Sequence, residues 1–445
     1  MNGRRLRDLA ACFEGVIPSI IATVDGMGVP NVSYLSHVHY LDDGHVALSN
    51  QFFSKTAANV RAGGRAALIV VDGRSGEQFL LEIAFVEAKT AGPLFERMAL
   101  HLEAMSAQQG MAGVMALRSA DIYRVLTWEP VPAPSSVLWS PAPPGPDAAD
   151  RLAASTRLAA EIAACRDADA MIDRVLQGMA DDFGIGHMMV LIPDEDGTRL
   201  SVMASRGYDT LGIGAEVALG DGVIGLAAKA RLPLRLADIS RGRRYAAAVR
   251  QETAAETHSV PYPGLAEPLS QMAIPLLGRG QLLGLVFAES PRRFAFTRED
   301  ENALALVAGH LAAGLALQEA AAGEAPAPAP APPPVPAEGR LRIRYYPFDD
   351  SIFLGEDYLV RGIPGRLLHH FLRAHLDEGR TDFTNREIRM DPRLRLPEVK
   401  DNLETRLILL RRRLDERAAP IRLSRPGRGQ IRLELDGTPE IEVVT

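Results

Sequence analysis

Residues 220–240 read GDGVIGLAAKARLPLRLADIS, and residues 270–290 read SQMAIPLLGRGQLLGLVFAES. In the first block a glycine turn opens a helix, and the strand Leu234–Asp238 follows. The second block contains two β-rich runs, Ser270–Leu276 and Leu282–Glu289, which predict two strands. GDGVIG lacks the Gly-Lys-Ser/Thr ending of a phosphate-binding loop, so we interpret it as a helix-entry turn. Together the two blocks predict an α/β domain.

Helices are expected on both sides of these blocks. Ala148–Phe183 places apolar residues in steps of mostly three or four, which predicts one amphipathic helix. Thr297–Glu319 begins with a capping threonine that is followed three residues later by an acid, which predicts a second helix. Further strands are expected at His187–Pro193 and Leu200–Ser205.

Two proline-rich stretches divide the chain. Residues 130–146 read PVPAPSSVLWSPAPPGP, and residues 320–338 read AAAGEAPAPAPAPPPVPAE. Proline fits neither a helix interior nor a central strand, so both stretches are predicted to be extended linkers. The predicted boundaries are 1–130 for the first domain, 131–147 for the first linker, 148–319 for the second domain, 320–339 for the second linker and 340–445 for the third domain.

The composition limits the class of protein. The 445 residues predict two to four domains, and the net charge of −7 excludes a basic coat over the whole chain. Residues 380–432 nevertheless carry 15 Arg and Lys against 8 Asp and Glu, so one domain is expected to meet a polyanion. Two cysteines exclude a disulfide framework and fit a reducing compartment. The longest apolar stretch, Ala303–Leu317, is too short for a membrane span, so a cytoplasmic protein is expected.

The first domain shows five β-rich runs separated by Gly and Asp turns, which predicts a barrel or a sandwich. The runs are Val16–Val24, Pro30–Val38, His45–Ser49, Arg65–Val71 and Gln78–Glu87. Residues 49–68, SNQFFSKTAANVRAGGRAAL, place polar side chains at a strand-to-helix junction. Hydroxyls, a cation and the free amides of a helix start are the groups that bind a phosphate monoester. The candidate phosphate ligands are Ser49, Asn50, Ser54, Lys55 and Thr56.

About residues 10–130 resemble the pyridoxamine 5'-phosphate oxidase-like family of FMN-binding split barrels. Ser49-Asn50 and Lys55 align with the family's stretch that holds the FMN phosphate. Gln78 matches the glutamine that contacts the flavin ring in that family. The resemblance implies a split β-barrel with FMN or a related flavin as cofactor.

Two positions depart from the family's phosphate clamp. Asn31 and Ser36 stand where the enzymes have an Arg and a Lys. The C-terminal Arg-Leu-x-Pro substrate signature of the enzymes is also replaced, by Tyr123-Arg124-Val125-Leu126. Vitamin B6 oxidation is therefore not expected. A barrel without flavin, in which Lys55 caps a surface turn, is the alternative.

About residues 165–318 resemble a GAF domain, with the two blocks quoted first as the most specific part. The resemblance implies a sensor of a small ligand, for example a cyclic nucleotide, a tetrapyrrole or haem, or a domain that binds nothing. The closing helix places four apolar residues at steps of three, four and four, a seam that suits a partner helix and predicts a homodimer. The alternative is that this seam packs on its own sheet. The four residues are Leu304, Val307, Leu311 and Leu315.

The third domain is predicted to contain strands, three helices and a hairpin. Thr384-Asn385-Arg386-Glu387 is a capping box that starts the second helix, and Pro397 is expected in the first turn of the third. Residues 421–435, IRLSRPGRGQIRLEL, predict a two-stranded hairpin with a basic tip. The order of elements resembles the OmpR/PhoB-type winged helix–turn–helix, across about residues 341–435.

That resemblance implies DNA binding through the third helix and the hairpin. Ile408 and Leu409 depart from it, because they are apolar where the family tends to present polar groups to DNA, and an apolar patch favours a protein partner. DNA binding and protein docking therefore both stay open. The candidate DNA-binding residues are Arg406, Arg412, Arg413, Arg425 and Arg428.

The assembly predicts a function. No catalytic set and no metal cluster is expected; His37, His39 and His45 alternate in neighbouring strands, but no carboxylate or cysteine completes a metal or haem site. A multidomain α+β chain with a split barrel, a GAF domain and a winged helix fits a cytoplasmic one-component transcriptional regulator that senses flavin or another small ligand. The alternatives are an FMN-dependent oxidoreductase with an accessory GAF domain, and a signalling adaptor whose winged helix grips protein.

Overall fold

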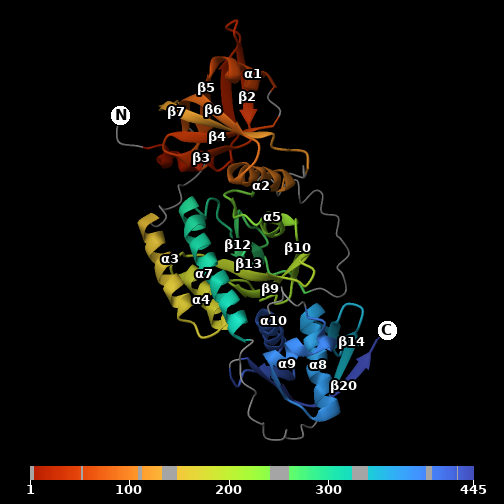
Figure 1. Ribbon diagram of the computed structural model, residues 1–445. Helices are drawn as coiled ribbons and strands as arrows, with labels where there is room; N and C mark the ends of the chain where they lie inside the picture. The colour runs from red at the N-terminus through yellow and green to blue at the C-terminus, as the bar shows by residue number, and fades with distance from the viewer. Residues whose placement is uncertain are drawn as a thin grey trace.

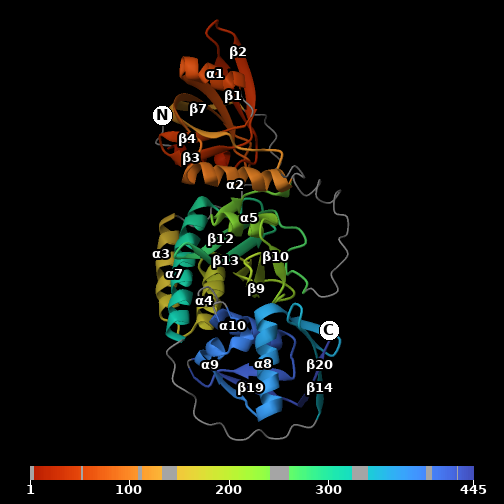
Figure 2. The same ribbon diagram turned by 45° about the vertical axis from the view of Figure 1, so that its right-hand side comes forward.

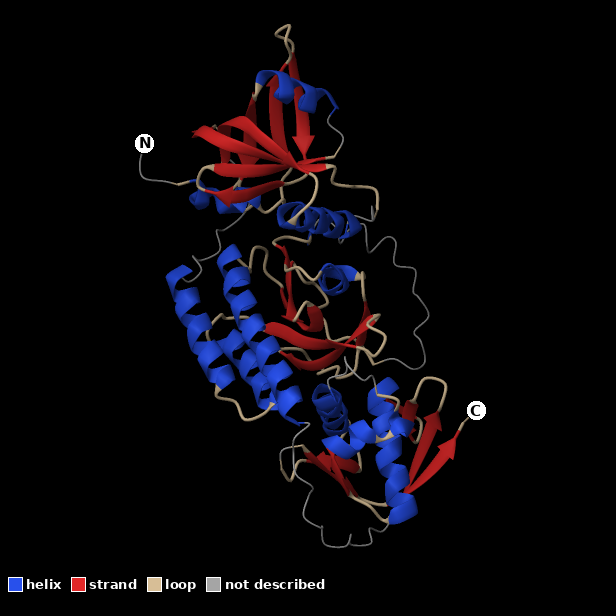
Figure 3. Cartoon of the chain, viewed as in Figure 1, coloured by secondary structure: helices blue, strands red, loops and turns tan. Residues whose placement is uncertain are grey.

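The computed structural model describes residues 5–51, 54–108, 113–132, 148–240, 260–322, 339–396, 403–427 and 429–444. These residues form three domains that follow one another along the molecule (Figure 1). The β-rich N-terminal domain lies at one end, the α/β domain in the middle and the C-terminal domain at the other end. Helices and strands are mixed in all three, as Figure 3 shows by colour, so the expectation of a multidomain α+β chain is confirmed.

The N-terminal domain is a seven-stranded antiparallel sheet that curls around one core, in the order β2-β1-β5-β6-β7-β4-β3. Alternate residues of β5 are buried, among them Leu68 and Val70, because successive side chains of a strand point to opposite faces. Its elements are η1 Leu6–Phe13, β1 Ser19–Val24, β2 Pro30–Leu35, β3 Val38–Asp42, β4 His45–Asn50, α1 Ser54–Gly63, β5 Arg65–Val71, β6 Gln78–Lys89, α2 Pro93–Gln108 and β7 Ser119–Val131.

The middle domain is a six-stranded sheet covered on both faces. Met188 and Val190 of β8 belong to the core under α3, α4 and α7, whereas Met189 and Leu191 belong to the core under α5. This explains why β8 is apolar throughout rather than alternating. Its elements are α3 Ala148–Ala163, α4 Ala168–Asp181, β8 His187–Pro193, β9 Arg199–Arg206, β10 Glu216–Ala218, α5 Gly222–Ala230, β11 Leu234–Leu236, β12 Ser270–Gly278, β13 Gln281–Ser290 and α7 Arg298–Ala322.

The single helix expected over Ala148–Phe183 is wrong, because the structure has two helices there. Asp167 accepts a hydrogen bond from the amide of Ala170 at 2.8 Å and caps the start of α4. The apolar stripe continues on both sides of the break, since α3 and α4 cover the same core. Periodicity alone therefore does not reveal where one helix ends and the next begins.

Helix α7 is long and apolar enough to cross a membrane by length and composition. Its four apolar seam residues are instead buried in the middle domain, where α7 packs against α3, α4 and β12. The seam predicted for a partner helix is therefore wrong, because the domain's own helices and sheet occupy it. The residues are Leu304, Val307, Leu311 and Leu315.

The C-terminal domain contains a four-stranded sheet, a three-stranded sheet and three α-helices between them. The capping box at Thr384 and Glu387 is confirmed, since each side chain bonds the backbone amide of the other residue. The expected start of the last helix at Pro397 lies outside the described residues. The elements are β14 Arg340–Tyr346, β15 Ser351–Leu354, β16 Asp357–Val360, α8 Gly362–Glu378, β17 Asp382–Thr384, α9 Asn385–Met390, η2 Pro392–Leu394, α10 Leu403–Glu416, β18 Ile421–Ser424, β19 Gln430–Leu435 and β20 Thr438–Val443.

Two helices connect the domains. In both views α2 lies between the N-terminal sheet and the middle domain, and α10 lies against the middle domain from the other side (Figures 1 and 2). Leu100 and Ala104 of α2 are part of the core under α5, and Ile408 and Leu409 of α10 are part of the core under α7. Each domain junction is therefore an apolar contact that continues the middle domain's own core.

Candidate functional site

Two of the candidate phosphate ligands already have partners inside the barrel. The hydroxyl of Ser49 accepts a hydrogen bond from the amide of His37 at 3.2 Å. The side-chain amide of Asn50 donates to Asp121 at 3.2 Å. Burial raises the pKa of Asp121, whose carboxylate also accepts from Ser119. A carboxylate at this position disfavours a phosphate beside Asn50.

The start of α1 has a different polar set. Thr56 is buried, and its hydroxyl accepts from the side-chain amide of Asn31 at 2.9 Å and lies 3.0 Å from the hydroxyl of Ser33. Lys55 is exposed next to it, whereas the side chain of Ser54 lies outside the described residues. A cation, hydroxyls and a helix start fit a phosphate here. Asn31, which replaces a clamp cation of the enzymes, is part of this set.

Gln78 does not join either group. It pairs with Val131 at one end of β7, whereas Ser49 and Asn50 pair with Ala120 and Ser119 at the other end. The structure therefore brings Thr56 and Asn31 together and separates Gln78 from Ser49 and Asn50. Ser36, the other replaced clamp position, lies 3.4 Å from Gln51 through its hydroxyl.

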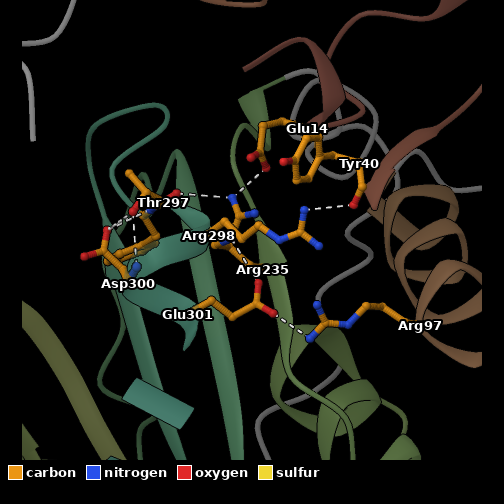
Figure 4. A network of polar contacts seen from close by, with 9 residues as sticks. Glu14, Tyr40, Arg97, Arg235, Thr297, Arg298, Asp300 and Glu301 are labelled. Carbon is orange, nitrogen blue, oxygen red and sulfur yellow. Dashed lines mark hydrogen bonds and ion pairs between the residues drawn. The ribbon is translucent and has the colours of Figure 1, made fainter. Parts of the chain in front are cut away.

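A buried ionic network joins the barrel to the middle domain (Figure 4). Arg235 of β11 donates to Glu14 at 2.5 Å and to Glu301 of α7 at 3.1 Å. Arg97 of α2 donates to the other oxygen of Glu301 at 2.7 Å. Burial alone would lower the pKa of Arg235, but Glu14 and Glu301 outweigh burial and raise it. The arginine is therefore charged at every pH at which the protein folds.

Arg298, the first residue of α7, reaches into the barrel. Its guanidinium donates to the backbone carbonyl of Tyr40 at 2.8 Å and lies 5.1 Å from the centre of the Tyr40 ring. Burial lowers the pKa of Arg298, and Glu301 raises it to a smaller extent. Two side chains therefore hold the N-terminus of α7 against the barrel. Arg298 of α7 bonds Tyr40 of the barrel, and Arg97 of α2 bonds Glu301 of α7.

Three histidines line the same junction. The rings of His37 and His101 stack with centroids 4.3 Å apart, and the ring of His39 lies 5.8 Å from that of His37. Burial lowers the pKa of His39 to about 2 and that of His101 to about 3, and it lowers that of His37 well below its usual range. Nδ1 of His37 and Nε2 of His101 are buried with no hydrogen-bond partner. The three imidazoles are therefore neutral.

Two cavities of about 150 and 60 Å³ adjoin these histidines, and His101 and Glu14 line both. His45, the third histidine of the sequence pattern, lies apart and contacts Asp42 at 3.0 Å. Within the described ranges no group of three or more His, Cys, Asp or Glu side chains is placed to bind a metal ion. The described side chains of the junction therefore form a cluster of neutral histidines and arginines.

Helix α2 supplies Arg97 and His101 to this junction, and it was not predicted from the sequence. The signal was present, since Met98 and Leu102 are four residues apart and both are buried. Arg97 and His101 have the same spacing and share a face of the helix.

None of the described arginines expected on DNA is free. Arg413 donates to the carbonyl of Leu359 at 3.0 Å and to Glu416 at 2.6 Å inside its own domain. Arg406 is 7% exposed and Arg425 ion-pairs with Glu404 at 2.8 Å, while Arg428 lies outside the described residues.

Arg412 points to the middle domain. It donates to Asp169 at 2.7 Å and to Asp173 at 2.6 Å, and Arg411 pairs with Asp169 as well. Burial alone would raise the pKa of Asp169, but Arg412 and Arg411 lower it. The three candidate DNA-binding arginines of the third helix are therefore largely covered by protein in this structure, namely Arg406, Arg412 and Arg413.

Comparisons with known proteins identify two of the three domains. Residues 7–125 match the family model described as pyridoxamine 5'-phosphate oxidase, and residues 165–316 match the model described as GAF domain. The chain therefore contains a pyridoxamine 5'-phosphate oxidase-like N-terminal domain, a split barrel of the FMN-binding type, and a GAF domain. No curated protein matches the chain.

Solved structures resemble single domains. The GAF domain from Acinetobacter phosphoenolpyruvate-protein phosphotransferase is 20% identical, with a TM-score of 0.32, over 38% of this chain and 95% of that chain. An FMN-binding protein from Syntrophomonas wolfei subsp. wolfei is 17% identical, with a TM-score of 0.24, over 28% and 88%. Free methionine-R-sulfoxide reductase from Neisseria meningitidis is 17% identical, with a TM-score of 0.31, over 39% and 92%. These partial likenesses carry no functional argument.

Proposed function

We propose that this chain is a cytoplasmic one-component regulator. The barrel and the GAF domain receive small ligands, and the C-terminal domain, a winged helix, binds DNA as the output. The observation that carries the proposal is helix α7, which touches both neighbours of the GAF domain. Its first turn holds Arg298 and Glu301 against the barrel, and Glu319 in its last turns pairs with Arg389 of α9. At 1.5 Å per residue, Glu301 and Glu319 are about 27 Å apart on one rigid element.

The ligand proposed for the barrel is FMN or a related flavin. The barrel is of the FMN-binding type, and the start of α1 offers Lys55, Thr56 and Asn31 to a phosphate. When bound, the flavin would supply a redox-active and coloured group. If the purified protein is colourless and does not bind added FMN, this assignment is wrong.

Replacing Lys55 by Ala should weaken FMN binding roughly tenfold, because the phosphate loses its charged contact. The measurement is a fluorescence titration of FMN with the full chain. Lys89→Ala is the matched control, since Lys89 is a surface lysine of the same barrel that pairs with Glu87 at 2.6 Å. Equal loss in both variants, or none in Lys55→Ala, contradicts the site.

DNA binding is tested by fluorescence anisotropy on the full chain with genomic fragments over a salt series. Each phosphate contact should contribute about −0.9 to the slope of log affinity against log salt. The titration is made on the wild-type chain without FMN, on the wild-type chain with FMN, and on the variant Asp169→Asn/Asp173→Asn/Glu319→Gln. Absence of salt-dependent binding in all three forms contradicts a DNA output.

A protein-docking output is the second candidate. Ile408 and Leu409 of α10 are 0% and 4% exposed because they pack into the GAF core, so this apolar pair does bind a protein surface within the chain. An adaptor would present the same pair to a second protein. The anisotropy experiment separates the two candidates, since only a DNA output gives a salt-dependent complex with DNA.

A homodimer is also proposed, on a surface different from the buried seam. Leu306 and Leu317 of α7 are 52% and 69% exposed and lie eleven residues apart, close to three helical turns, so they share one stripe. Leu306→Lys/Leu317→Lys should convert a dimer to a monomer in light scattering. A wild-type chain that is monomeric at micromolar concentration contradicts the proposal.

A further inference from the structure

Helix α10 is buried from two sides. One stripe of the helix packs in the core of the C-terminal domain, namely Leu403, Leu407, Leu410 and Leu414. Ile408 and Leu409 belong instead to the GAF core, and α10 touches α4, α7 and β9. The face that a winged helix would turn to DNA is therefore the face that the GAF domain covers.

The charges across this contact are complementary. Asp169 and Asp173 are one turn apart on α4 and face Arg411 and Arg412 of α10. The Arg412 side chain is 16% exposed and that of Asp169 is 18% exposed, so water screens this pair only in part. The two carboxylates supply the negative charge that DNA phosphates would otherwise supply to the arginines.

Four further polar contacts lie in the same interface. Glu319 of α7 pairs with Arg389 and accepts from the amide of Glu404 at 3.2 Å. Arg361 pairs with Glu216 of β10. Arg366 approaches Glu195 at 3.3 Å. In the ion pairs of this contact the C-terminal domain supplies the arginines and the GAF domain supplies the acids.

We infer that the GAF domain masks α10, with Asp169, Asp173 and Glu319 occupying a basic surface that binds DNA only after the two domains separate. This inference rests on the proposed function. A major groove about 12 Å wide admits a helix only when the side of the helix that reads DNA is free, and the side of α10 with Arg411 and Arg412 lies against the GAF domain. DNA and the GAF domain therefore compete for the same face.

Competition has a measurable consequence. The apparent DNA affinity equals the intrinsic affinity reduced by the fraction of molecules that are open. Neutralising the acids on the GAF side leaves every residue of α10 unchanged, so it alters the open fraction and not the DNA-binding surface. Breaking partly buried ion pairs weakens a contact strongly, because the remaining charges are left without partners.

The test compares two triple variants of the full chain. The opened variant is Asp169→Asn/Asp173→Asn/Glu319→Gln, which removes three acids from the interface. The matched control removes three exposed acids of the helical face of the GAF domain, one each from α3, α4 and α7, as Asp150→Asn/Asp181→Asn/Glu299→Gln. DNA affinity is measured by anisotropy on genomic fragments. Hydrogen–deuterium exchange of the α4 and α10 amides is measured without DNA.

The opened variant should bind DNA at least tenfold more tightly than the control, and its α10 amides should exchange at least tenfold faster. Equal exchange in both variants overturns the masking. If the α10 amides exchange faster in the opened variant but neither variant binds DNA, the GAF domain does cover α10 and the partner of α10 is not DNA. The protein-docking output then remains. If both variants bind DNA with equal affinity, the GAF domain and DNA do not compete for α10.

Discussion

Lowering the pH from 7 to 5 is expected to destabilise the junction between the barrel and the GAF domain by at least about 4 kcal/mol. His37, His39 and His101 are buried there as neutral imidazoles beside three arginines. Each histidine must gain a proton when the junction opens to water. A shift of one pKa unit corresponds to about 1.4 kcal/mol, so His39 and His101 each contribute about 2 kcal/mol over this range, and His37 contributes in the same direction.

The sign follows from the direction of the pKa shifts. The folded pKa of His39 is about 2 and that of His101 about 3, whereas the unfolded value is near 6.5. Below pH 6.5 the unfolded chain therefore binds protons that the folded chain does not bind. The stabilisation is fully present above pH 6.5 and is lost progressively as the pH falls below it. Nearby arginines lower the pKa values of the histidines further, because a protonated imidazole would be repelled by their positive charge. These arginines are Arg97, Arg235 and Arg298.

Urea unfolding between pH 7 and pH 5 tests this expectation, followed by the fluorescence of Trp128, which packs against Phe79 in the barrel. Trp139→Phe removes the other tryptophan of the chain. His101→Gln should reduce the loss of stability between pH 7 and pH 5 by about 2 kcal/mol. His45→Gln replaces an exposed histidine of the same barrel and is the control. A pH dependence that is equal in the parent and in His101→Gln contradicts the prediction.

The strands were the most predictable part of the fold. Arg65–Val71 was expected and is β5 with the same bounds, because its alternating burial needs only local sequence to be recognised. The break between α3 and α4 was not predicted, since the apolar stripe runs across it. Helix α2, Pro93–Gln108, was not predicted, although its buried residues Met98 and Leu102 recur at helical spacing.

The junctions between domains have no local signature. Arg235 and its partner Glu14 are 221 residues apart, and Arg412 and Asp169 are 243 apart. The sequence of α10 shows an apolar stripe and a run of arginines. This pattern fits a helix whose arginines face solvent and equally a helix whose arginines are covered by another domain. Ile408 and Leu409 were the informative departure, because two apolar residues outside the stripe required a protein surface to cover them.

Replacing Arg235 by Met is expected to destabilise the chain by about 3–5 kcal/mol. The side chain of Arg235 is 10% exposed and it is shared by Glu14 and Glu301, which are themselves 13% and 7% exposed (Figure 4). Met keeps the length of the side chain but removes its charge. Two carboxylates then remain in the junction, where Arg97 is the one ion-pair partner left to them among the described residues, and an uncompensated buried charge is costly.

The same measurement, urea unfolding at pH 7 followed by Trp128, distinguishes charge from packing. Arg235→Met/Glu14→Gln/Glu301→Gln should be more stable than Arg235→Met alone, because it removes the carboxylates that the first substitution leaves unpaired. Arg157→Met is the matched control, since Arg157 pairs with Asp182 at 2.6 Å on an exposed surface and water replaces that contact. If Arg235→Met costs no more than Arg157→Met, the network in Figure 4 does not hold the barrel on the GAF domain. The route from the barrel through α7 to α10 would then depend at its first step on the contact of Arg298 with the backbone carbonyl of Tyr40 and not on the ion pairs of Arg235.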